Sequence, residues 1–164
     1  KYGDQKTLSP YFIHSLYAYD RSVTWYSKLK QEYEQNKLIV LDRYTTSSLF
    51  YQSAFIEEIE EKNKFIDYVV NTEYKLIGIK EPDQVFFLEA PFDLVTEVRN
   101  KRNETREEQE DIHEKNLDFL KKVYENGKYV SNYLGWTKIN CANDNKLKTI
   151  EEIHEEIMSK LNLK

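Results

Sequence analysis

Residues 38–52 read LIVLDRYTTSSLFYQ, four consecutive apolar residues followed at once by an acidic and a basic one. An unbroken apolar run without alternation is typical of a strand that is buried on both faces, as in a parallel sheet covered by helices. Two further runs of this kind, QVFFLEA at 84–90 and WTKINCA at 136–142, lie between helical stretches. The pattern therefore predicts an α/β domain with a parallel sheet.

Amphipathic helices surround these runs. The longest is expected from Ser9 to Gln35, since a serine suits the N-cap and a proline suits the first turn. Its apolar residues recur at spacings of three and four, which predicts a single apolar stripe: Phe12, Leu16, Tyr19, Val23 and Tyr26. Further helices are expected at 46–56, 57–75, 91–102, 111–126 (ending before Gly127) and 149–161, with a polar loop at 143–148.

Length and composition limit the possible functions. The 164 residues, 19.8 kDa in mass, suit a single domain, 1–164. The net charge of −5 argues against a nucleic-acid partner, which would require a basic surface. No apolar run is long enough for a membrane span, and a lone cysteine suits a reducing compartment, so we expect a cytoplasmic protein without a membrane or nucleic-acid partner.

Arginine is scarce, with 5 of the 24 basic residues, and its uses are therefore informative: Arg21, Arg43, Arg99, Arg102 and Arg106. A guanidinium favours planar, two-pronged recognition of anions, so each position is a candidate anion site. Three of the five lie in one stretch of eight residues, 99–106, which contains no apolar side chain. This segment is either a solvated charged helix or a flap that brings cations over a polyanion.

Two other segments carry candidate binding groups. Asp42 and Arg43 directly follow the first apolar run, at the sheet edge where ligands gather in doubly wound folds, although a surface ion pair would give the same pattern. Tyr17 and Arg21 are four residues apart on one helix face, so a ring and a guanidinium could hold a flat heterocycle; Tyr17 could equally be a core residue. We expect the three histidines to be surface or boundary residues and Cys141 to be a small core residue.

Taken together, LYAYDR at 16–21, LDRYTTSSLFYQ at 41–52, EPDQVFFLEAP at 81–91, the arginine-rich segment ending in DIHE, and NCANDN at 140–145 resemble the thymidylate kinase family. Members transfer a phosphoryl group from ATP to dTMP with Mg²⁺. The resemblance implies a parallel sheet with flanking helices, like that of the P-loop nucleoside-monophosphate kinases. It also implies a homodimer formed by helix packing, for which the aromatic-rich first helix is a candidate.

The resemblance also implies residue roles on the dTMP side. Tyr17 matches the aromatic residue that stacks on thymine, and Arg21 matches the arginine that hydrogen-bonds a thymine carbonyl. Ser48 and Gln52 match positions that contact the ring, and Tyr51 matches the aromatic residue that favours deoxyribose. Asp42 and Arg43 match a pair in which the carboxylate acts near Mg²⁺, directly or through water, and the arginine holds the dTMP phosphate.

On the ATP side, the resemblance implies a lid at about 99–114. Its arginines, Arg99, Arg102 and Arg106, would be catalytic and contact ATP, and Asp111 and Glu114 match an acidic pair of the lid. Ala142 and Asn143, followed by Asp144, resemble the loop beside the adenine.

One family feature is missing from these 164 residues, namely the phosphate loop G-x-x-x-x-G-K-[ST] that cradles the ATP phosphates. In the family this loop and the first strands precede the segment that matches the start of this chain. We therefore expect these residues to supply the acceptor site and lid, with the N-terminal strands absent from the chain. The alternatives are a nucleotide-binding fragment without catalysis and a deoxynucleoside kinase.

Overall fold

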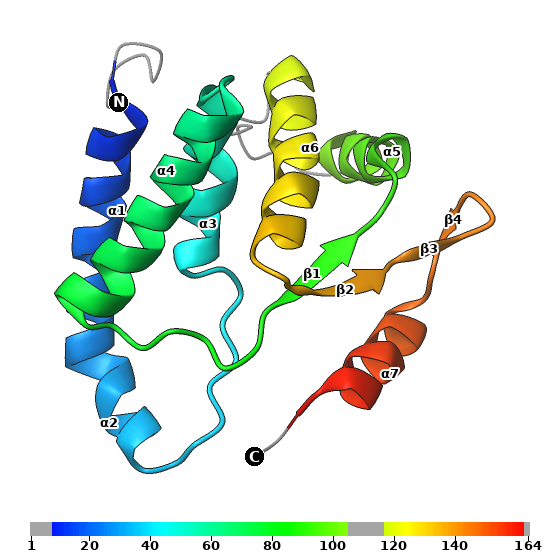
Figure 1. Cartoon of the computed structure of the whole chain (residues 1–164). Helices are drawn as coiled ribbons and strands as arrows, with labels where there is room; N and C mark the ends of the chain where they lie inside the picture. Colours follow the sequence, from blue (N-terminus) through cyan, green and yellow to red (C-terminus); the bar gives the residue numbers. More distant parts are fainter. Residues whose placement is uncertain (1–7, 105–116, 163–164) are drawn as a thin grey trace. The chain divides into compact units, whose positions relative to one another are not determined.

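The computed structural model describes residues 8–104 and 117–162 of the chain. It divides into two compact units, Lys1–Glu81 and Pro82–Lys164, each of which is described here by itself. Arg106, Asp111, His113 and Glu114 lie outside the described residues. The first unit is helical among its described residues, and the second combines helices with two small sheets (Figure 1).

The first unit begins with the predicted long helix. It runs through α1 (Pro10–Thr24), a π-helical segment η2 (Trp25–Leu29) and α2 (Lys30–Glu34). The Ser9 hydroxyl accepts a hydrogen bond from the Phe12 amide at 3.1 Å, which confirms the predicted N-cap. Three more helical stretches follow: α3 (Thr45–Tyr51) with the 3-10 turn η3 (Ser53–Phe55), α4 (Ile59–Val70), and the π-helical η4 (Asn71–Ile77).

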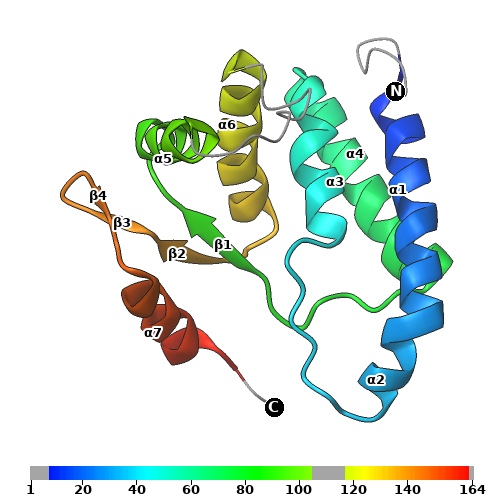
Figure 2. The same cartoon turned by 180° about the vertical axis from the view of Figure 1, so that it is seen from behind.

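The core of this unit lies among α1, α3 and α4, which are side by side in Figures 1 and 2. Leu49 of α3 and Phe65, Ile66 and Val69 of α4 are at most 1% exposed. The ring of Tyr11 on α1 packs edge-on against Phe65, with centroids 5.0 Å apart. Burial of these side chains is the main stabilising contribution in the unit, at roughly 1.5–3 kcal/mol per large apolar side chain.

The apolar stripe of the first helix is not the face that is buried in this unit. Its five members are each about half exposed or more, from 49% for Val23 to 72% for Tyr19. The neighbouring face is buried instead, with His14 and Ala18 at 0% and 2%. The same face carries Ile13, which is 6% exposed, and Arg21, which forms an ion pair with Glu73 of η4.

The predicted strand at 38–41 is also wrong. These residues have no regular structure, and Leu38 and Val40 are 66% and 83% exposed. A strand needs a neighbour for its backbone hydrogen bonds, and no strand is described within residues 8–81. The segment instead connects α2 to α3.

The second unit contains the parallel pairing that the sequence predicts. Strand β1 (Phe86–Glu89) pairs with β2 (Thr137–Asn140), with Leu88 opposite Ile139. Helices α5 (Phe92–Glu104) and α6 (Leu117–Tyr133) connect them, and α7 (Ile150–Lys160) follows. Helices α6 and α7 lie on opposite sides of the strand pair (Figure 2). Ile139 is fully buried but Leu88 is 53% exposed, so the first strand is not covered on both faces as predicted.

Two boundaries in the second unit differ from the predictions. Gly127 does not end a helix: it is buried within α6, which continues to Tyr133. The 143–148 segment is not a plain loop, because β3 (Ala142–Asn143) and β4 (Lys146–Leu147) form an antiparallel hairpin. Asp144 and Asn145 at its tip have φ of 46° and 59°, the left-handed pair that a two-residue hairpin turn requires.

Helix α7 begins as predicted. Thr149 and Glu152 form a capping box, in which each side chain accepts a hydrogen bond from the backbone amide of the other residue. Cys141 is buried, as predicted, and burial raises the pKa of its thiol. Across residues 8–104 and 117–162, no helix is both long enough and apolar enough to cross a membrane.

Candidate functional site

Arg21, one of the predicted base-binding residues, forms a buried ion pair with Glu73. The Arg21 guanidinium donates from Nε to Glu73 Oε2 at 2.7 Å and from Nη2 to Glu73 Oε1 at 2.5 Å. The Glu73 side chain is fully buried and that of Arg21 is 13% exposed. Two parallel charge-assisted hydrogen bonds fix the plane of the guanidinium as well as its position.

Helix α3 adds hydroxyl groups to this pair. Ser48 Oγ accepts a second hydrogen bond from Arg21 Nη2 at 2.8 Å, and Thr45 Oγ1 donates to Glu73 Oε2 at 3.2 Å. Both side chains are at most 1% exposed, and Gln52, one turn further along, is 4% exposed. The structure therefore brings together the predicted residues Arg21 and Ser48, with Gln52 at the end of the same helix.

The local sequence explains how Glu73 reaches this position. After α4 the helix widens into the π-helical segment η4, which ends at Gly78 with φ of 80°. Widened turns of this kind change the direction in which side chains point and are frequent at functional sites. The backbone amides of Gly78 and Ile79 donate to the Glu73 carbonyl at 3.0 and 3.1 Å, which holds the Glu73 backbone. The carboxylate is thereby turned inward from an otherwise charged helix.

His14 contradicts the prediction that the histidines are surface or boundary residues. It is fully buried, and its ring packs edge-on against Phe65 and Tyr68, with centroids 6.1 and 5.7 Å away. Its Nδ1 lies 3.6 Å from Glu73 Oε1. Burial, and to a smaller degree the charge of Arg21, lower the pKa of His14 to about 4 although Glu73 opposes the shift. The ring is therefore neutral at pH 7. His154 on α7 is exposed, as predicted.

The other predicted acceptor-side residues lie on three elements: Tyr17 on α1, Asp42 and Arg43 in the loop before α3, and Tyr51 in the last turn of α3. Tyr17 is 48% exposed, and Asp42 and Arg43 are also exposed. The Arg43 guanidinium lies over the Tyr51 ring, with Cζ 5.5 Å from the ring centroid. Arg43 has φ of 69°, a left-handed conformation that is uncommon outside glycine and is found most often at functional sites.

The predicted ATP-side residues belong to the second unit where they are described. Arg99 lies on α5 and is partly buried. Arg102 belongs to the last turn of the same helix. Ala142 is 8% exposed, whereas Asn143 is exposed on the hairpin. These residues therefore lie on α5 and on strand β3 of the hairpin. Their roles toward ATP remain predictions.

A magnesium ion is implied by the resemblance through Asp42. Within residues 8–104 and 117–162, no three His, Cys, Asp or Glu side chains are grouped so that they could hold a metal by themselves. Mg²⁺ is commonly held by one or two carboxylates together with substrate phosphates and water. A single exposed carboxylate at Asp42 fits that kind of site.

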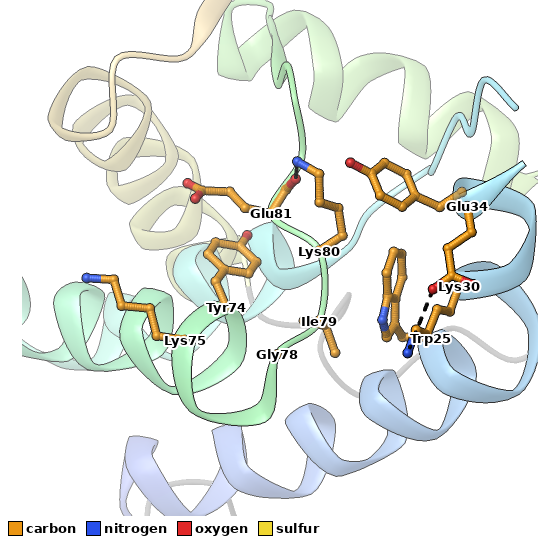
Figure 3. Close-up of a pocket in the computed structure, with 10 residues that line it drawn as sticks. Trp25, Lys30, Glu34, Tyr74, Lys75, Gly78, Ile79, Lys80 and Glu81 are labelled. Carbon is orange, nitrogen blue, oxygen red and sulfur yellow. Dashed lines mark hydrogen bonds and ion pairs between the residues drawn. The ribbon is translucent and has the colours of Figure 1, made fainter. Parts of the chain in front are cut away.

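A separate pocket of about 430 Å³ lies in the first unit (Figure 3). Its walls include Trp25, Tyr33 and Tyr74, and burial raises the pKa of Tyr74 to about 12, so that this phenol is neutral. Lys80 Nζ donates to the Glu81 carbonyl at 2.8 Å at its edge. None of the described residues that line it is a predicted site residue.

Sequence reasoning missed three members of the buried cluster, namely Glu73, Thr45 and His14. Glu73 lies in a charged stretch that is typical of a solvated helix face. Its partner Arg21 is 52 residues away, so no local spacing links them. In the sequence, Thr45 is one of several hydroxyl-bearing residues after Asp42, and nothing distinguishes it from its neighbours.

Comparison with known proteins gives one match. The family model described as Thymidylate kinase matches residues 2–157. Searches of curated proteins and of solved structures returned no significant match.

Proposed function

The chain belongs to the thymidylate kinase family, and we propose that it binds dTMP as the acceptor in phosphoryl transfer from ATP, giving dTDP. Family membership implies a nucleotide phosphotransferase; the identity of the acceptor is our proposal. The observation that carries it is the arrangement of Arg21 and Ser48, a fixed guanidinium beside a buried hydroxyl in the first unit. We expect the reaction to take place in the cytoplasm.

The proposed base site consists of Tyr17, Arg21, Ser48 and Gln52. The exposed Tyr17 ring offers a stacking surface, and base stacking on an aromatic side chain contributes roughly 1–3 kcal/mol. Arg21 can only donate hydrogen bonds, so it suits the carbonyl oxygens of thymine. Ser48 and Gln52 would contact the ring from α3.

The proposed phosphate site consists of Asp42 and Arg43, next to Tyr51. Arg43 would hold the dTMP phosphate, and its left-handed backbone supports a specialised role for this residue. The Tyr51 ring under the guanidinium would limit its movement and crowd the 2′ position of the sugar. A Mg²⁺ ion beside Asp42 would supply charge neutralisation for the transferred group.

The proposed donor side belongs to the second unit. Arg99, Arg102 and Arg106 would approach the ATP phosphates, with Asp111 and Glu114 in the same lid and Ala142 and Asn143 near the adenine. Cations around the moving phosphoryl group stabilise the negative charge that spreads over it in the transition state. A closed lid would also exclude water, which prevents wasteful hydrolysis of ATP.

Calorimetry with dTMP tests the acceptor site on the 164-residue chain, and thymidine is the matched control. Binding of dTMP and not of thymidine supports the proposal, because Arg43 requires the phosphate. Preference for thymidine would instead indicate a deoxynucleoside kinase. Transfer is tested on the natural protein by coupling ADP release to dTMP addition, and no dTMP-dependent ADP formation would refute the assignment.

A second candidate function is nucleotide binding without catalysis. The specific observation in its favour is that these 164 residues contain no G-x-x-x-x-G-K-[ST] motif to cradle the ATP phosphates. It predicts dTMP binding by calorimetry with no turnover in the ADP assay.

We also propose that the protein forms a homodimer through α1. Four of its apolar residues, Phe12, Leu16, Tyr19 and Val23, are 49–72% exposed along one face. A contiguous exposed apolar face is typical of an interaction surface. Sedimentation should give a dimer for the wild type and a monomer for Leu16→Glu; a wild-type monomer at high concentration would refute the proposal.

A further inference from the structure

Arg21 is restrained in a way that leaves one edge of its guanidinium for a ligand. Of its five N–H groups, three are used: Nε and one Nη2 hydrogen by Glu73, and the other Nη2 hydrogen by Ser48. Among the described residues, no group accepts a hydrogen bond from the two Nη1 hydrogens. Because Arg21 keeps 13% of its side chain exposed while Glu73 keeps none, this edge is the part of the pair that a ligand can reach.

Glu73 is itself held from several sides. Thr45 Oγ1 donates to its Oε2 and two backbone amides donate to its carbonyl, while the buried His14 ring lies beside it without a hydrogen bond. A carboxylate held in this way cannot follow a moving arginine. The guanidinium plane is therefore set by the fold before any ligand binds.

We infer that Glu73 is a positioning residue that confers base specificity, by fixing Arg21 so that it presents only the Nη1 edge. This inference rests on the proposed function. A guanidinium edge offers two donors and no acceptor. It can therefore donate to the carbonyl at position 4 of thymine but cannot pair with the amino group that cytosine carries there. A loosely held arginine could turn away from the amino group, and the discrimination would fall.

The test compares the affinities of dTMP and dCMP by calorimetry on the full 164-residue chain. The wild type should prefer dTMP. Glu73→Gln keeps the size of the side chain but removes its charge and one of its two acceptor oxygens. We expect dTMP affinity to fall about tenfold, and the dTMP-to-dCMP affinity ratio to fall by a similar factor.

Two controls separate positioning from a general loss of stability. Val69→Ala removes buried volume from α4 in the same unit, where Val69 is fully buried, and should leave the ratio unchanged in the folded protein. In an Arg21→Met background, Glu73→Gln should produce no further change in the ratio, because Glu73 acts through Arg21.

If Glu73→Gln does not fold, Thr45→Val replaces it, because this near-isosteric change removes only the hydroxyl that donates to Glu73. It should lower the ratio in the same direction by about two- to fivefold. A wild-type ratio in a folded Glu73→Gln variant, or in Thr45→Val where that is the variant used, would overturn the inference. A wild-type chain that binds no dTMP would instead refute the proposed function itself.

Discussion

Acid should destabilise the first unit through a single buried side chain, His14. Burial holds its pKa at about 4, against an ordinary value of 6.5, so the folded state keeps the ring neutral while the unfolded chain protonates it. The unfolded state therefore binds more protons between these two values. Stability from this group is fully present above pH 6.5 and is lost progressively as the pH falls toward 4.

The size of the effect follows from the difference between the two pKa values. The difference of about 2.5 pKa units, at about 1.4 kcal/mol each, sets an upper limit of about 3.5 kcal/mol on this loss below pH 4. Between pH 7 and pH 5, the expected loss in the free energy of unfolding is about 2 kcal/mol. The attraction between the Glu73 carboxylate and a protonated His14 ring needs no separate correction, because the pKa of about 4 for His14 already includes it.

Urea unfolding followed by tryptophan fluorescence measures this loss. In a Trp136→Phe background, the buried Trp25 is the only tryptophan left and reports on the first unit. His14→Phe keeps a ring against Phe65 but cannot be protonated, so it should lose about 2 kcal/mol less than the parent between pH 7 and pH 5. His154→Gln, at an exposed position on α7, should behave like the parent. Equal losses in the parent and in His14→Phe would refute the reasoning.

Three other perturbations should give measurable results. Thr149→Ala removes the cap of α7 and should lower the free energy of unfolding by about 1 kcal/mol in a urea titration. By the same measurement, Gly78→Ala should lower the free energy of unfolding more than Gly135→Ala does. Both glycines have positive φ, but only a Cβ at position 78 would meet an atom within 4 Å, the Tyr26 hydroxyl at 3.2 Å. Equal losses of about 1 kcal/mol would contradict this. Cys141 should react with a thiol reagent far more slowly in the folded chain than in urea, because burial raises its thiol pKa and blocks access.

Local signals in the sequence predicted the features that depend on near neighbours. The cap at Ser9 and the helix at 149–161 are both present, because each depends on residue type and short spacing. The apolar runs at 84–90 and 136–142 contain strands for the same reason, whereas their parallel pairing joins distant parts of the chain. The 38–41 run failed for the opposite reason. Its apolar residues favour a strand, but a strand also needs a hydrogen-bonding neighbour, which local composition cannot supply.

The first helix shows that the clearest apolar stripe of a helix is not always the face that is buried in its unit. Its apolar residues form a clear stripe, and yet the buried face is the one that carries His14, Ala18 and Arg21. A buried guanidinium requires a partner, and that partner, Glu73, comes from a segment that looks solvated. The spacing of Arg21 to Tyr17 marks the arginine as a candidate in the sequence, whereas no sequence signal marks Glu73, its partner.

The scarcity of arginine predicts two-pronged recognition of anions, and Arg21 performs it on an anion of its own chain. Lysine could not take its place: a single ammonium has three donors on one atom, whereas this site uses three donors on Nε and Nη2 toward Glu73 and Ser48 and leaves a separate edge on Nη1. Because the charge is neutralised by Glu73, that edge acts on a ligand mainly through directed hydrogen bonds. An exposed lysine would attract any anion, but a paired arginine selects for the position of an acceptor atom, as recognition of a base requires.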